Sequence, residues 1–291
     1  MPELPEVEIR RLYLESSSLK QSIAHINVED TKLLTTDYAV LSERLIGLSF
    51  VGTRRVGKNL FVFTDDPTVI IRMHFGMTGD LQYYHASLDR PRFARIVFAF
   101  ENGFNLGFLC PRKFERVGLV ANIDQFLIEK KIGPDGLAIT LDELSRRICQ
   151  RKSPIKPVLL DQRTTAGLGN WIVDEVLFQA RIHPEQPANS LTDRDMNQLH
   201  TAIRLVLETA IRYEATYRNF PASFLIHVRE WDTSPYNDME AHKFCPRCHT
   251  RIERTEVGGR TTFHCPNCQK IVVLKPETSN TLCLPNKTSH R

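Results

Sequence analysis

The spacing of apolar residues changes along the chain, and the change divides it. After a first helix-like stretch, the first half carries short apolar runs separated by turn signals. Two hairpins are predicted, one pairing 60–63 with 69–71 and the other pairing 96–100 with 104–109. Asn102-Gly103 is a strong hairpin signal because glycine tolerates a positive φ. Several such runs within about 120 residues predict a β-sandwich or barrel.

Beyond residue 120 the apolar spacing becomes helical. Helix starts are predicted at Thr140 with Glu143 as a capping box, at Ser153-Pro154 as N-cap and first helical residue, and at Thr192 with Asp195. The third helix should end near Tyr213. Its apolar face comprises Met196, Leu199, Ile203, Val206, Leu207, Ala210 and Ile211.

These patterns predict an α+β protein of several domains. Breaker residues at 131–136 separate an N-terminal helix plus β-sandwich, 1–131, from a helical domain, 135–220. A cysteine-rich segment, 242–273, forms a third unit. The final stretch, 276–291, is polar with two prolines, so we expect a disordered tail.

Composition narrows the class of protein without identifying it. With 42% hydrophobic and 25% charged residues, the chain is neither collagen-like nor of low complexity. No apolar run reaches the roughly 18 residues of a membrane span, so we expect no membrane partner. The first six residues lack the basic and apolar regions of a secretory signal, which predicts a cytoplasmic, intracellular location. A net charge of +4 permits an anionic partner such as nucleic acid but does not require one.

Cysteine spacing predicts a metal site. Four of the seven cysteines form two C-x-x-C pairs, Cys245 with Cys248 and Cys265 with Cys268. Each pair places two thiolates on one turn, and two such turns close a tetrahedral Zn²⁺ site. Four sulfur ligands leave no position for water, so one structural zinc is expected. Gly258-Gly259 suits the tip of the hairpin between the pairs, with Arg260 projecting outward.

The remaining cysteines have no evident partner. Cys110 and Cys149 are expected to serve packing, and Cys283 to be a free thiol in the tail.

The amino terminus carries candidate chemistry in Pro2, Glu3 and Glu6. Removal of Met1 exposes a secondary amine, which can attack a sugar C1 and form an iminium. A helix with Pro5 at its first position, carrying Val7 and Leu14 inward, would favour the neutral amine, and the two carboxylates could transfer protons. Taken alone, the stretch is more simply explained as a helix start whose glutamates complement the helix dipole.

Six motifs occur in the order found in one family. They are Pro-Glu-Leu-Pro-Glu-Val-Glu at 2–8, Gly-Lys-Asn-Leu at 57–60, His-Phe-Gly-Met-Thr-Gly at 74–79, Pro-Arg-Lys-Phe at 111–114, Ile-Lys-Pro at 155–157 with Gly-Leu-Gly-Asn-Trp-Ile-Val-Asp-Glu at 167–175, and the cysteine hairpin at 259–270. Together they resemble the formamidopyrimidine-DNA glycosylase and endonuclease VIII family, and the first branch more closely. The resemblance extends to about Lys270.

The resemblance implies a bifunctional glycosylase and abasic-site lyase that excises oxidised bases of the formamidopyrimidine or 8-oxoguanine type. Damaged double-stranded DNA would be its partner, and we expect a monomer. Pro2 would attack C1′ of the damaged nucleotide and Glu3 would protonate the sugar oxygen. Glu6 would assist proton handling or orient the sugar. Lys58 would hold a phosphate or help to expel the base.

The same resemblance implies a set of DNA contacts. A base inside a duplex must be flipped out and the gap filled, and Met77, Arg112 and Phe114 match the family's void-filling residues. The turn before Asn170 matches a helix–two-turn–helix element, whose helix N-terminus favours a phosphate. Lys156 and Arg260 would complete a phosphate clamp.

Several positions depart from the family pattern. Cys110 and Glu115 replace the Asp and Gly that usually flank Pro-Arg-Arg-Phe, and Phe93 and Val56 stand where a His and an Arg are usual. Residues 218–243 do not resemble the loop that caps 8-oxoguanine. Two alternatives therefore stay open, an enzyme preferring oxidised pyrimidines or single strands and a non-catalytic DNA-binding protein. Intact Pro2, Glu3 and Lys58 argue against the second.

Overall fold

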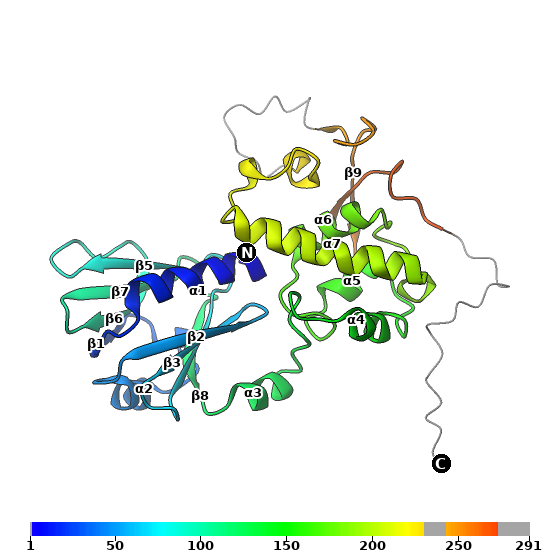
Figure 1. Cartoon of the computed structure of the whole chain (residues 1–291). Coiled ribbons are helices and arrows are strands. Elements are labelled where there is room, and N and C mark those ends of the chain that lie inside the picture. Colours follow the sequence, from blue (N-terminus) through cyan, green and yellow to red (C-terminus); the bar gives the residue numbers. More distant parts are fainter. Residues whose placement is uncertain (1, 230–242, 273–291) are drawn as a thin grey trace, which may run out of the picture. The chain divides into compact units, whose positions relative to one another are not determined.

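In the computed structural model, the protein consists of two compact units, Met1–Ile132 and Gly133–Arg291 (Figure 1). The structure describes residues 2–229 and 243–272. The expected disordered tail and Cys283 lie outside these residues. The division between the units falls within the breaker-rich segment 131–136.

The first unit contains two four-stranded antiparallel sheets, ordered β1-β6-β7-β5 and β2-β3-β4-β8. Their strands are β1 (Ile23–Val28), β2 (Phe50–Val56), β3 (Asn59–Thr64), β4 (Ile70–His74), β5 (Asp80–His85), β6 (Ala94–Phe100), β7 (Phe104–Leu109) and β8 (Arg116–Val120). The β3–β4 and β6–β7 hairpins are the two predicted from the turn signals. The predicted β-sandwich is thereby confirmed.

Apolar side chains from both sheets and from α1 (Leu4–Ser18) form the core of this unit. Phe50 on β2 meets Phe98 and Phe100 on β6 edge-on, with ring centroids 5.8 and 5.6 Å apart. Val7 and Leu14 of α1 are completely buried. Three short elements, η1 (Thr31–Leu33), α2 (Tyr38–Leu45) and α3 (Ile123–Glu129), complete the unit.

The second unit is helical and includes one hairpin. Its elements are α4 (Leu141–Ile148), α5 (Ile155–Leu160), α6 (Asn170–Ala180), η2 (Ala188–Ser190), α7 (Asp193–Arg212), η3 (Tyr217–Asn219), η4 (Leu225–Val228), β9 (Glu253–Val257) and β10 (Arg260–His264). Every residue of α6 from Trp171 to Phe178 is buried, and this includes the charged Asp174 and Glu175. The predicted apolar face of α7 is buried up to Ala210, whereas Ile211 is only half-buried.

Two of the three predicted helix starts are accurate. Thr192 and Asp195 form a reciprocal capping box at α7, and the Thr140 hydroxyl accepts from the Glu143 amide at α4. At α5 the N-cap is Pro154, so the prediction of Ser153 was wrong by one residue. The cause is tertiary, because the first α5 amides donate to distant backbone carbonyls. Ile155 N donates to Gln186 O at 2.8 Å, and the next amide donates to Pro184 O at 3.1 Å.

The cysteine segment packs within the second unit. Phe178 of α6 and Leu225 of η4 share an apolar cluster with Phe263, Cys245 and Cys265. Gly258, in the hairpin tip, lies so close to α5 that an added Cβ would sit 2.9 Å from Pro157 Cβ. The hairpin therefore extends the core of the helical unit.

A buried ionic cluster joins the hairpin to the helices. Asp174 on α6 is completely buried and accepts from Lys156 Nζ at 2.7 Å, from Arg229 Nη1 and from Phe263 N. Lys156 Nζ also donates to Thr261 O and to Thr262 Oγ1, both at 2.8 Å. All three ammonium hydrogens are thus directed to acceptors inside the protein. Lys156 fastens α5 to α6 and to β10.

The described helices include none that is both long and apolar enough to span a bilayer.

Replacing Lys156 with Met should destabilise the second unit by about 3–5 kcal/mol, because a buried ion pair would lose one partner. The matched control is Lys152→Met, an exposed lysine of the same segment, which should change stability by less than about 0.5 kcal/mol. Chemical denaturation of the full chain, followed by circular dichroism, measures both. Equal stability of the two variants would contradict this placement of Lys156.

Candidate active site and zinc centre

The first turn of α1 is closed by a reciprocal cap. Glu6 Oε2 accepts from Glu3 N at 3.0 Å, and the Glu3 carboxylate accepts from the Glu6 backbone N–H. The helix begins at Leu4, so Pro5 occupies its second position and the prediction of the first position was wrong by one residue. Pro2 and Glu3 are buried. The residue that bears the candidate amine therefore directly precedes an anchored helix start.

Lys58 lies in the tight turn between β2 and β3, beside Gly57 with its φ of 58°. Arg55 ties this turn to α1, because its Nε donates to Glu8 Oε2 at 2.8 Å and its Nη1 donates to Gly57 O at 3.1 Å. Glu8 is less than two helical turns beyond Glu3. The turn that carries Lys58 is thus connected, through Arg55 and Glu8, to the helix that begins at the amino-terminal cap.

Glu8 is a structural anion that sequence patterns alone did not single out. Burial by itself raises the pKa of its carboxyl, but hydrogen bonds and charges from Arg11 and Arg55 outweigh that effect and leave the pKa lowered. Its partner Arg55 is 47 positions away in the sequence, so the ion pair cannot be predicted from a local sequence pattern.

His74 ends β4 and supports the loop that carries Met77. Its Nδ1 accepts from Gly76 N at 3.2 Å. Burial, and then the charges of Arg72, Lys58 and Arg116, lower the pKa of His74 to about 4. The imidazole is therefore neutral near pH 7 and can act as an acceptor.

The structure brings the three void-filling candidates together on two adjoining loops. Gly76 has a φ of 56°, and a Cβ there would lie 2.6 Å from the Phe114 carbonyl carbon. The Arg112 guanidinium stacks 5.4 Å from the centroid of the Phe114 ring. Phe114 is 52% exposed and Met77 is half-buried, so both side chains reach the surface of the unit.

Glu115 fills the junction between these two loops. It is completely buried and accepts from Thr78 Oγ1 at 3.3 Å. A Cβ on Gly79 would lie 2.8 Å from its Cγ. Its second carboxylate oxygen has no hydrogen-bond partner among the described residues. A glutamate in place of the family's usual glycine thus links the Met77 loop to the Phe114 loop.

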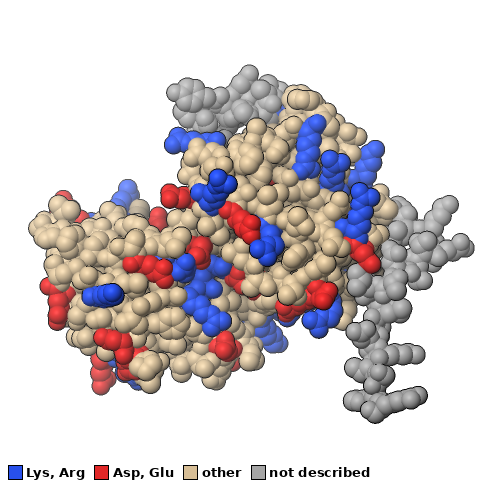
Figure 2. All heavy atoms as spheres, viewed as in Figure 1, with Lys and Arg blue, Asp and Glu red and all other residues tan. Residues whose placement is uncertain are grey.

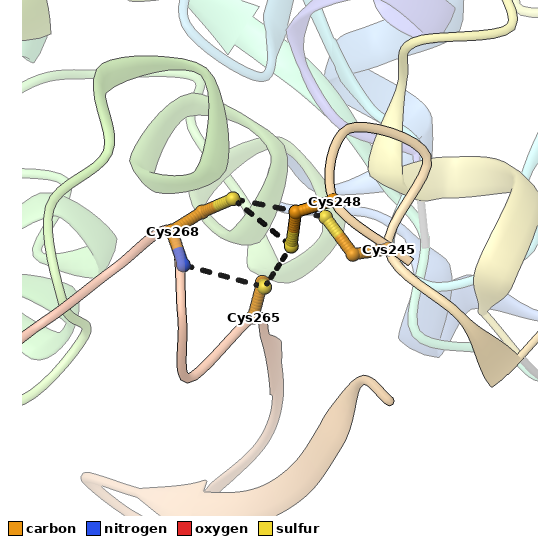
Figure 3. Close-up of side chains that lie close together, drawn as sticks. All are labelled: Cys245, Cys248, Cys265 and Cys268. Carbon is orange, nitrogen blue, oxygen red and sulfur yellow. Dashed lines mark hydrogen bonds between the residues drawn. The ribbon is translucent and has the colours of Figure 1, made fainter. Parts of the chain in front are cut away.

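Four cysteines converge in the second unit, where Figure 3 shows their sulfurs facing one another. Sγ–Sγ distances are 3.9 Å for Cys245–Cys268 and 3.5 Å for both Cys248–Cys265 and Cys248–Cys268. Sulfurs 2.3 Å from one tetrahedral zinc would be about 3.8 Å apart. The four thiolates form one structural Zn²⁺ site, as the spacing predicts.

Asn170 and Arg260 are neighbours on one face of the second unit. Asn170 is the first residue of α6, and its Nδ2 donates to Thr261 O at 2.9 Å. Gly167, with a φ of 104°, shapes the turn before the helix. Arg260 is exposed beside Thr261. This pairing suits a phosphate near the helix N-terminus.

Lys156 does not belong to that exposed group. The clamp role predicted for it was wrong, because its ammonium is completely buried and already donates to three acceptors. It reaches Asn170 only indirectly, through Thr261 O, to which both side chains donate.

Lowering the pH from 6.5 to 4 should destabilise the first unit through His74. The unfolded imidazole takes up a proton near 6.5, whereas the folded one resists until about 4. The stability it contributes is therefore complete above 6.5 and falls by up to about 3 kcal/mol as the pH reaches 4. His74→Asn keeps an acceptor for Gly76 N but does not titrate, so denaturation curves should show less pH dependence. An identical dependence in both proteins would contradict the buried neutral imidazole.

Replacing Cys265 with Ser should release the zinc and unfold the hairpin, since a closed four-sulfur site contributes folding free energy directly. Elemental analysis should give about one zinc per wild-type chain and much less in the variant. Cys110→Ser is the control, because that buried thiol lies in the other unit. Full zinc retention by Cys265→Ser would overturn the assignment.

Comparison with known proteins places the chain in a family. Models described as the formamidopyrimidine-DNA glycosylase N-terminal domain, the H2TH domain of the same enzymes, and a zinc finger found in FPG and IleRS match residues 1–117, 132–221 and 243–271. The chain is 33% identical to a formamidopyrimidine-DNA glycosylase of Arabidopsis thaliana, over 93% of this chain and 71% of that one. Identity to the Streptococcus pneumoniae R6 enzyme of the same name is 34%, over 93% and 99% of the two chains.

Solved structures agree with this result. The Lactococcus lactis formamidopyrimidine-DNA glycosylase, non-covalently bound to DNA containing an AP site, superposes with a TM-score of 0.79. That chain is 29% identical, and the match covers 92% of this chain and 99% of the other. The motifs, both units and the zinc site thus agree with one set of relatives. The chain belongs to the formamidopyrimidine-DNA glycosylase family of DNA repair enzymes.

Proposed function

We propose that the protein is a bifunctional glycosylase and abasic-site lyase that acts on oxidised bases in double-stranded DNA. The observation that carries the proposal is the buried, reciprocally capped helix start directly behind Pro2. The Lactococcus lactis relative has been solved with AP-site DNA and with DNA containing a formamidopyrimidine nucleotide. Both ligands fit a substrate class of damaged purines and the abasic sites that remain after excision.

The chemistry begins at the Pro2 nitrogen once Met1 has been removed. Its lone pair forms a bond to C1′ as the bond from C1′ to the base breaks, and the base leaves with that electron pair and takes up the proton that the Pro2 nitrogen loses. Glu3 delivers a proton to the sugar ring oxygen as the ring opens, which gives an iminium. Loss of a C2′ proton then expels the 3′ phosphate and cleaves the strand.

The residues around Pro2 favour this sequence. The positive end of the α1 dipole disfavours protonation of the amine and so keeps it nucleophilic. Glu6 holds the Glu3 backbone through its cap, which suits it to orienting the amine and the sugar. Lys58, on the turn tied to α1 through Arg55, would hold a phosphate or assist departure of the base.

DNA would be held by two separate sets of residues. Met77, Arg112 and Phe114 stand on adjoining loops of the first unit and would fill the space left by the flipped base. Asn170 and Arg260 in the second unit would bind backbone phosphates and set the register. Lys156 would support them from inside by holding Thr261.

The lesion, oligomeric state and location are part of the same proposal. We place formamidopyrimidine and 8-oxoguanine first among lesions, on the strength of the family. A monomer acting in the cytoplasm on cellular DNA is the simplest arrangement, since all the proposed catalytic and DNA-contacting residues come from one chain. The segment 218–243, on which lesion choice depends, lies partly outside the described residues.

Glu3→Gln should lose base excision more than abasic-site cleavage, because an abasic substrate has already lost its base and needs less acid assistance. Cleavage assays and borohydride trapping on a panel of oligonucleotides, carrying 8-oxoguanine, a formamidopyrimidine, an oxidised pyrimidine or an abasic site, measure both steps. Glu43→Gln, an exposed glutamate of α2, is the control. DNA binding without any trapped adduct would contradict the proposal and favour a non-catalytic protein.

A further inference from the structure

A polar pocket of about 670 Å³ lies in the second unit and shares no residue with the sites described above. It is lined by Arg146, Arg147, Gln150, Arg151, Arg163 and Thr164, together with Glu143. Four guanidinium groups thus meet in one pocket. Figure 2 shows both basic and acidic side chains on the visible face of each unit.

Short-range contacts hold the guanidinium groups in place. Arg147 donates to Glu143 Oε1 and, through Nη1, to Arg163 O at 3.0 Å. Arg163 binds Asp161 with both Nε and Nη2 at 2.9 Å, and Arg151 Nη2 lies 3.7 Å from the same carboxylate. Four guanidinium groups against these two carboxylates leave two positive charges in excess.

Thr164 also lines the pocket but contributes no polar group to it. It is only 2% exposed, and its hydroxyl oxygen is buried away from solvent. Polar contact with a ligand would therefore come from the guanidinium groups.

We propose that this pocket binds phosphate, and that its ligand is the backbone of nucleic acid. Planar guanidinium groups match phosphate oxygens in pairs, and two excess charges suit one or two phosphate groups. The volume falls in the range of sites that hold small ligands, while the polar lining excludes an apolar one.

The chain segment that carries Arg163 is also tied to the turn that leads to Asn170. Gln162 lies between Asp161 and Arg163, and its side chain accepts from Gly167 N at 2.9 Å and donates to Leu168 O at 2.8 Å. A strand held at the α6 N-terminus and one held at the pocket would therefore contact the same short loop. The pocket would extend the DNA contact of this unit beyond Asn170 and Arg260.

The first test compares the zinc-loaded wild-type protein with Arg146→Gln/Arg163→Gln and with the control Arg204→Gln, an exposed arginine of α7. Affinity for an undamaged duplex is measured over a range of salt concentrations. The double variant should bind more weakly, with a salt slope lower by roughly one to two units, and the control should match the wild type. Cleavage of an abasic oligonucleotide at saturating enzyme should stay unchanged, so failure here is distinct from failure of the proposed chemistry.

Arg146→Lys/Arg163→Lys excludes misfolding as an explanation, since it keeps every charge and removes only the planar guanidinium groups that pair with phosphate oxygens. It should retain the wild-type melting temperature and lose several-fold in phosphate affinity. A second arm titrates inorganic phosphate and pyrophosphate into each protein by calorimetry. Binding of these ions with unchanged duplex affinity would overturn the assignment to the nucleic-acid backbone. Unchanged duplex affinity and no difference in ion binding between wild type and variants would overturn the phosphate site itself.

Discussion

The reciprocal cap between Glu3 and Glu6 is the constraint on which the proposed chemistry depends. Chain termini usually fray, and a nucleophile at a terminus has a defined position only if the next residues are held. Here two backbone amides of the first turn are satisfied by two side chains of the same turn. The glutamates thus stabilise the helix start and stand beside the amine, so the structural and the functional explanations of this segment are compatible.

The same helix connects the amine to the rest of the first unit. Arg10 donates to Glu6 O at 2.8 Å and to Gly79 O at 3.1 Å, at the end of the Met77 loop. Arg55 makes the corresponding connection to the turn of Lys58. In the second unit Asp174 has a comparable role, because it gathers Lys156, Arg229 and the β10 backbone around one buried carboxylate. Such clusters contribute more to a defined geometry than to net stability, because burying charge carries a large desolvation cost.

Local signals in the sequence were enough to predict much of this protein. The turn signals, the capping box at Thr192 and the cysteine spacing each act over a few residues, and the structure contains the elements they predict. Predictions that depended on distant partners were the ones that failed. The α5 cap is set by carbonyls some 30 residues further along the chain, and the acceptors that bury Lys156 at 261 and 262 lie more than 100 residues away.

Glu115 shows a second limit on what can be predicted from the sequence. Its departure from the family pattern was visible, but the consequence depends on Gly79 and Thr78, which stand 36 and 37 positions away. Only the folded chain shows that the two loops meet and that this carboxylate fills their junction.

The most direct test of the account is the position of the covalent bond between protein and DNA. After borohydride reduction of the complex with abasic DNA, protease digestion and mass spectrometry locate the modified residue. The account predicts that the adduct maps to Pro2 and disappears when the terminal amine is blocked by a retained tag, while DNA binding persists. An adduct on Lys58, or one that is undiminished by the blocked terminus, would contradict it.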